Sequence, residues 1–130
     1  MTVGLAAAVA NAFLDALGNA TNYTAPTTFY VKLYLGDPGA AGTSNAAANT
    51  TRQQASFAAA ASGAITTDAA LTWTNVSNTE TYSHVGFWDH VSAGNFLGSD
   101  DLAVSRAVTA GDTFTIATGD LDLSFTPIAA

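Results

Sequence analysis

The residues most suggestive of chemistry lie in one short stretch, SHVGFWDH, at positions 83–90. It holds a serine, two histidines and an aspartate, the residue types of a hydrolase triad. In such a triad a nucleophile, a base and an orienting carboxylate come within hydrogen-bond reach. No G-x-S-x-G frame surrounds the serine. On a strand, His84 and Trp88 lie about 13 Å apart along the axis, which is too far for one catalytic centre.

The same stretch has the pattern of a strand followed by a turn. Alternation places Val85 and Phe87 on one face and His84 on the other. We expect Asp89 to cap the turn and His84 to form a hydrogen bond to a neighbour. Gly86 leaves room for a bulky ring to lie across the strand.

Other arrangements of polar residues give no stronger indication of a catalytic or metal centre. A metal site needs about three or four converging ligands. His84 and His90 are separated by a strand end, and Asp120 and Asp122 are about 7 Å apart on one strand face. The acidic pair at 100–101 has no EF-hand spacing, and no carboxylate pair stands out for glycoside hydrolysis. We therefore predict a protein that is not an enzyme and binds no metal or cofactor.

Composition limits the architecture and the partners. A chain of 130 residues fits one domain, since domains cluster at about 100–150 residues. Three basic and ten acidic residues give a net charge of −7, which repels nucleic acid and anionic membranes. There is no cysteine, and no run reaches the roughly 20 apolar residues that span a bilayer. Large apolar side chains are few, so subunit association is expected to add stability.

The first segment, 1–18, has the pattern of the chain's one helix. Thr2 can cap it and Gly18 can end it. Four apolar residues follow at spacings of four: Leu5, Val9, Phe13 and Leu17. We predict that these four either anchor the protein to a partner or pack on its own sheet. The segment lacks the basic residues that begin a signal peptide, so we expect a mature N-terminus.

The rest of the chain has the pattern of short strands. TFYVKLYL at 28–35 alternates strictly, and GDPG at 36–39 is a turn. The segment 40–50 is low in large side chains and predicts an exposed loop. Further strands are expected at 52–58, 64–73, 81–89, 95–100, 103–110, 112–117 and 120–125. This rhythm predicts an all-β fold: an antiparallel β-sandwich or jelly-roll-like barrel of about seven or eight strands over 27–126.

Aromatic residues on these strands could stack against sugars. The candidates are Tyr30, Tyr34, Trp73, Tyr82 and Trp88. Aromatic residues in sheets more often belong to a core or an interface. We single out Tyr82 and Trp88 as candidate interface residues.

The order of motifs resembles a family of small virion structural proteins of actinobacterial phages, often described as tail-fibre or minor structural proteins. The motifs are FYVKLYLGDPG, TTRQQASF, ALTWTN, SHVGFWD, GNFLGSDDL and TAGDTFTIATGDLDLSF, from about Thr27 to Phe125. The resemblance implies a non-enzymatic β-domain present in many copies in a virion. Its partners would be the major capsid protein or other virion proteins. We expect a homo-oligomer, with a trimer favoured by closed cyclic symmetry.

The position in the virion is a separate question. The chain has no heptad-bearing shaft or β-helical repeat, which favours a capsid decoration protein, a minor capsid or cement protein on the outer shell. Binding only to the assembled shell would stabilise it, and an acidic surface suits the side away from DNA. Two alternatives stay open: a tail-fibre or receptor-binding module for host glycans, and a carbohydrate-binding module.

Overall fold

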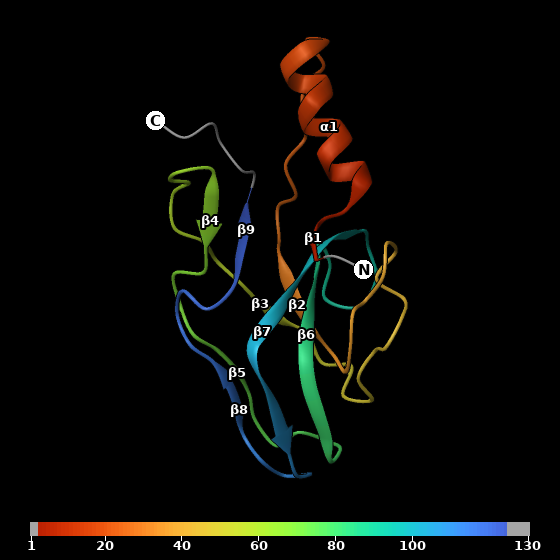
Figure 1. Ribbon diagram of the computed structural model, residues 1–130, viewed down its shortest axis with the longest axis vertical. Helices are drawn as coiled ribbons and strands as arrows, with labels where there is room; N and C mark the ends of the chain where they lie inside the picture. Colours follow the sequence, from red (N-terminus) through yellow and green to blue (C-terminus); the bar gives the residue numbers. More distant parts are fainter. Residues whose placement is uncertain (1–2, 125–130) are drawn as a thin grey trace.

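The structure, a computed structural model that describes residues 3–124, is mostly β with one helix near the N-terminus (Figure 1). The predicted all-β antiparallel class with one N-terminal helix is confirmed. The elements are β1 (Gly4–Leu5), α1 (Ala7–Gly18), β2 (Tyr30–Tyr34), β3 (Gln53–Gln54), β4 (Ala64–Thr66), β5 (Leu71–Trp73), β6 (Glu80–Trp88), β7 (Phe96–Val108), β8 (Phe114–Ile116) and β9 (Asp122–Ser124).

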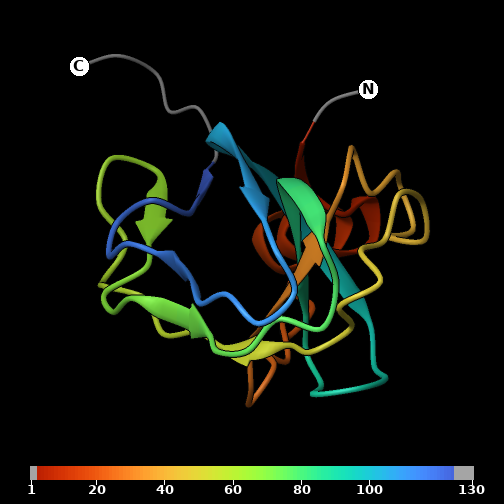
Figure 2. The same cartoon turned by 90° about the horizontal axis from the view of Figure 1, so that it is seen from below.

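The strands form one five-stranded sheet and two strand pairs. The sheet has the order β1-β7-β6-β2-β3, and the pairs are β4-β9 and β5-β8, all antiparallel. Seen from below, the sheet and the two pairs face each other across the interior (Figure 2). The long β6–β7 hairpin runs through the middle of the sheet and carries much of the core.

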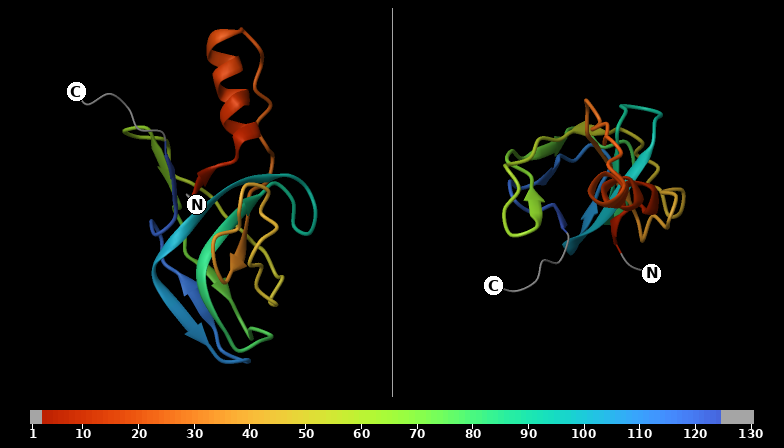
Figure 3. Two further views of the ribbon diagram at one scale, coloured as in Figure 1. Left: turned by 45° about the vertical axis from the view of Figure 1, so that its right-hand side comes forward. Right: turned by 90° about the horizontal axis from the view of Figure 1, so that it is seen from above.

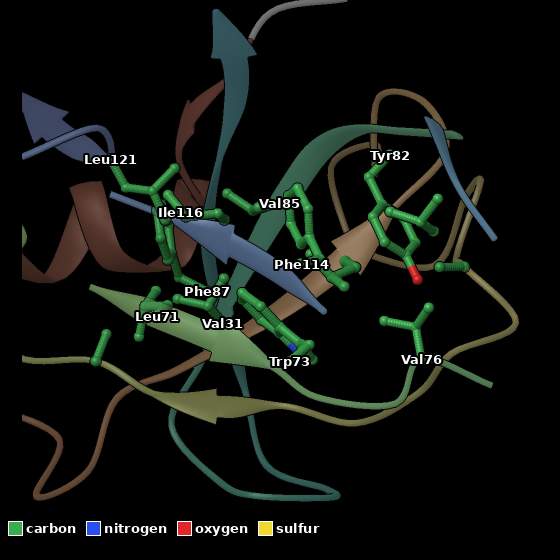
Figure 4. Close-up of a cluster of buried hydrophobic side chains, with 14 of the residues drawn as sticks. Val31, Leu71, Trp73, Val76, Tyr82, Val85, Phe87, Phe114, Ile116 and Leu121 are labelled. Atoms are coloured by element: carbon green, nitrogen blue, oxygen red, sulfur yellow. The ribbon is translucent and has the colours of Figure 1, made fainter. Parts of the chain in front are cut away.

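The core is built from the inward positions of these strands (Figure 4). Val31 and Leu33 of β2 are fully buried, as the strict alternation of that strand predicts. The indole of Trp73 is buried and its Nε1 donates to the Thr51 carbonyl at 2.9 Å. The cluster also includes Val85, Phe87, Leu71, Phe114, Ile116, Leu121 and Leu123.

Two predicted strand boundaries are wrong. The run 64–73 is two strands, because the chain bends at 68–69; the Thr67 N–H still donates to the Leu121 carbonyl and extends the β4–β9 register by one residue before the bend. The runs 95–100 and 103–110 are one strand, β7. The acidic pair does not interrupt it, because the Asp100 carboxylate accepts the N–H groups of Asp101 and Asp122 at 2.9 and 3.0 Å.

The helix begins later than the sequence pattern predicts. Gly4 has φ +141°, and Leu5 pairs with Gly98 of β7, so Leu5 is a strand residue. Ala6 extends this pairing through its N–H to the Leu97 carbonyl and is the N-cap, without a side-chain cap. The proposed cap Thr2 lies outside the described residues. Gly18 is the last helical residue rather than a stop beyond the helix.

The loop at 40–50 is only partly exposed, in contrast to the prediction. Gly42, Ala47 and Asn49 are buried. The Glu80 carboxylate accepts the backbone N–H of Ala48 at 2.7 Å and of Asn49 at 3.2 Å. The loop therefore covers part of the sheet, because polar anchors hold it there although it has few large side chains.

Candidate functional site

The stretch SHVGFWDH forms the end of β6 and the start of a turn. The Ser83 hydroxyl lies 2.8 Å from His84 Nδ1, which confirms that His84 bonds a neighbour. Asp101 is opposite His84 in the strand register. Within residues 3–124, however, no hydrogen bond joins these two side chains, so a nucleophile–base–carboxylate chain is not assembled.

Asp89 caps the turn that follows β6, as predicted. Its carboxylate accepts the Asn95 backbone N–H at 2.7 Å and the Asn95 amide at 2.9 Å. These bonds lower the pKa of Asp89, because they favour the ionised form. His90 Nδ1 accepts the N–H groups of Ser92 and Ala93. The polar groups of this stretch therefore hold the turn rather than converge on a substrate.

Gly86 accommodates a large ring, which confirms the predicted role of this glycine. A Cβ at position 86 would lie 2.6 Å from Cε2 of Tyr34. Tyr34 is fully buried, its hydroxyl donates to the Gly42 carbonyl at 2.8 Å, and it accepts Trp88 Nε1 at 3.1 Å. The ring is therefore enclosed between the strand and the loop at 40–50.

A second small cluster thus forms on the outer face of the sheet, around Trp88. The Arg52 guanidinium lies 4.4 Å from the Trp88 ring centroid, and Phe96 lies 5.4 Å from it. Arg52 also donates to the carbonyls of His90 and Ala93, both at 2.8 Å. Trp88 is half-buried, and much of its surface is used inside its own chain.

Tyr82 is not a surface residue, which corrects its prediction as an interface residue. It is fully buried, and its ring lies 5.1 Å from Phe114. The register of β6 on β7 shifts between Tyr82 and His84. A bulge of this kind breaks the alternation, so Tyr82 and Val85 both point inward. Of the five candidate stacking aromatics, Tyr34, Trp73 and Tyr82 are buried.

One buried carboxylate, Asp100, links β7 to β9. It accepts the Asp122 N–H, and burial is the main cause that raises its pKa to about 6. Asp101 and Asp122 contribute as nearby like charges. Within the described part of the chain no group of three His, Cys, Asp or Glu side chains could hold a metal ion.

The other distinctive region is the end of the molecule where α1 stands apart from the β body (Figures 1 and 3). None of its twelve residues is buried. Val9 and Phe13, together with Leu5, line an open apolar cavity of about 390 Å³, whose other lining residues include Phe29, Ile65, Leu97 and Leu123 of the β body. Phe13 also packs edge-on against Tyr23, with ring centroids 4.5 Å apart. No helix among residues 3–124 is both long and apolar enough to cross a bilayer.

Leu17 does not share the face of Val9 and Phe13, although the spacing of four suggests it. A helix has 3.6 residues per turn, so each step of four rotates the position by about 40°. Leu17 is 84% exposed and Leu14 is 60% exposed. The predicted stripe is therefore divided between a side that packs on the body and a side left in solvent.

Comparison with protein families decides the class. Residues 4–124 match the family described as podophage GP4 fiber I protein gp80. The chain belongs to this Gp80 family. The match covers α1 and all the strands, and it confirms the predicted virion structural family. A search of curated proteins finds no match. The Gp80-family chain is thus a virion structural protein.

Two residues of this Gp80-family chain stand out in the structure although the predicted site leaves them out: the exposed Leu14 and the turn-binding Arg52. Leu14 falls between the members of a four-residue spacing, but it shares a three-four spacing with Ala7, Ala10 and Leu17, which a heptad count would detect. Arg52 has no sequence pattern that marks it. It meets the 90–93 turn only because β3 and β6 lie on either side of β2.

Proposed function

We propose that this protein is a non-enzymatic, single-domain structural subunit on the outside of a phage particle, and that assembly completes its packing. The observation that carries this proposal is α1, an apolar helix without a buried residue. Helices of about 12 residues are marginal in water unless they pack on something. The exposed Leu14 and Leu17 therefore support a partner at this end of the molecule.

Our first candidate for its position is a virion fibre, in which the protein is a repeated subunit bound to other virion proteins. The description of the matched family as a fibre protein supports this position. We expect a homo-oligomer, with a trimer as the favoured cyclic form.

Capsid decoration is the second candidate. The described residues form a compact β body with one projecting helix, not an extended shaft, and this favours a cement protein bound to the major capsid protein. The net charge of −7 suits the outer side of a shell filled with DNA. The glycan-binding alternatives have less support, because Tyr82 is buried and Arg52 covers Trp88.

Immunogold labelling of intact particles tests the proposal and separates the two positions. Antibodies against the β body should label the particle exterior. Label restricted to the tail region would support the fibre, while label spread over the head would support decoration. Intact particles that stay unlabelled, when disrupted particles or lysates contain the protein, would contradict an external role.

A further inference from the structure

The helix α1 has three sides of different character. At 100° per residue, Val9, Ala12, Phe13 and Ala16 share one side, and all four are half-buried; on this side Val9 and Phe13 line the apolar cavity and Phe13 packs against Tyr23. The polar side carries Ala8, Asn11, Asp15 and Gly18, all exposed. The third side, called here the exposed stripe, consists of Ala7, Ala10, Leu14 and Leu17.

The exposed stripe has the spacing of a coiled-coil seam. Its members are separated by three, four and three residues, as are successive a and d positions of a heptad. They fall within an arc of about 80° on the helix. Ala10 is half-buried, whereas Ala7, Leu14 and Leu17 are exposed. The chain's own body therefore leaves most of this side uncovered.

The partner that best fits the exposed stripe is the same stripe on another copy. In a parallel, cyclic arrangement each a or d residue meets its own equivalent, so one sequence supplies both surfaces. The stripe has no charge, and the one charged residue of α1, Asp15, lies on the polar side. Contact through the stripe thus keeps the acidic groups of a chain with net charge −7 away from the seam.

The position of α1 permits this contact. The helix stands beyond the ends of the strands and runs roughly along the long axis of the molecule (Figures 1 and 3). Copies arranged side by side around an axis can therefore bring their helices together. We propose that parallel copies of this chain associate through Ala7, Ala10, Leu14 and Leu17 of α1; this rests on the proposed function of a repeated virion subunit.

Cysteine crosslinking of the full chain tests the proposal directly, because the native sequence has no cysteine. Leu17→Cys places a thiol on the exposed stripe, and Ala8→Cys is the matched exposed control on the polar side, away from the seam. With a short bismaleimide at micromolar protein, Leu17→Cys should give covalent dimers in high yield and Ala8→Cys should give few. Equal yields from the two variants, or none from Leu17→Cys, would overturn the proposal.

Sedimentation equilibrium supplies a second test that requires no crosslinker. Replacing Leu14 and Leu17 together by lysine should weaken self-association by about 100-fold or more, since two exposed leucines lose their burial in the seam. The control combines Ala8→Lys with Asp15→Asn, which makes the same change in net charge on the polar side, away from the seam, and should preserve the oligomer. Far-ultraviolet circular dichroism checks that both variants fold. A monomeric wild type, or an oligomer that the leucine variant leaves intact, would contradict the seam.

These measurements are independent of where the protein sits on the particle. If the seam forms in solution but labelling finds no protein outside the virion, the proposed function fails and the seam stands. If labelling finds the protein on the outside of the virion but crosslinking fails, the seam is wrong and the proposed function stands.

Discussion

Gly86→Ala is the substitution that most directly tests the packing of the outer cluster. The added Cβ would lie 2.6 Å from Cε2 and 3.1 Å from both Cζ and the hydroxyl of Tyr34. The ring has little freedom to move, because it is fully buried and makes two hydrogen bonds, with Gly42 and Trp88. The substitution must therefore strain the cluster or displace the ring.

The expected cost combines two effects. Overpacking a filled site costs about 1–3 kcal/mol, and each displaced hydrogen bond costs about 1 kcal/mol. We predict that Gly86→Ala lowers the free energy of unfolding by about 2–4 kcal/mol. The midpoint temperature should fall by about 3–5 °C for each kcal/mol in a chain of this size.

Urea unfolding followed by tryptophan fluorescence measures this change. Gly18→Ala is the control, because an added Cβ there meets nothing within 4 Å, and in a helix alanine should raise stability by up to about 1 kcal/mol. In a Tyr34→Leu background, Gly86→Ala should cost markedly less, since the clashing ring atoms are gone. A loss under about 0.5 kcal/mol for Gly86→Ala alone, within the range of neutral surface changes, would refute the packing argument.

Three further predictions concern polar groups. The raised pKa of Asp100 means that its protonated form stabilises the fold below pH 3.8, and that this stability is lost as the pH rises through about 6. After allowance for solvent screening the loss is about 1–2 kcal/mol; Asp100→Asn should abolish it in urea titrations between pH 4 and 7, and an unchanged slope would exclude Asp100 as its source. Arg52→Ala should lower the free energy of unfolding by about 1–2 kcal/mol and change Trp88 fluorescence, because it removes the Nη1 donor to two turn carbonyls and the guanidinium over the indole. An unaltered spectrum would argue against the contact between Arg52 and Trp88. Glu80→Ala should release the loop at 40–50 and speed amide exchange at Ala48 and Asn49, because both N–H groups lose their acceptor. Glu80→Gln should retain part of the protection. Equal exchange in wild type and Glu80→Ala would show that other contacts hold the loop.

The sequence predicts those parts of the fold in which one local pattern determines the outcome. Val31 and Leu33 alternate without interruption and are buried as expected. The roles of Asp89 as a turn cap and of Gly86 as a strand residue without a side chain, next to a large ring, are also predicted correctly. Both roles depend mainly on the type of residue at that position. The strand, turn and ring contact of SHVGFWDH therefore follow from the sequence.

The errors arise where distant contacts decide. The inward side of Tyr82 depends on a bulge against β7, which no local alternation shows. Leu5 joins a strand because it pairs with Gly98 of β7. Strand β7 stays continuous because the Asp100 carboxylate accepts a hydrogen bond from the Asp122 N–H. Such partners are set by the tertiary fold and lie outside any short window of sequence.

For the candidate site, too, some features could be predicted from the sequence and others depend on the tertiary fold. A count of apolar residues finds Val9, Phe13 and Leu17, but only the position of the β body shows that Leu17 lies on a different side from the other two. The order of motifs predicts the virion structural family, and the family match confirms it. The position within the particle depends on contacts with other proteins, which one chain does not contain.

The most direct test is a cryo-electron microscopy reconstruction of the intact particle at a resolution that shows helices. We predict copies of this fold on the exterior, with their α1 helices gathered around a common axis and Leu14 and Leu17 between neighbouring copies. A reconstruction in which the exposed stripe of each copy faces solvent would contradict the seam. A particle that lacks this fold on its outside would contradict the proposed role.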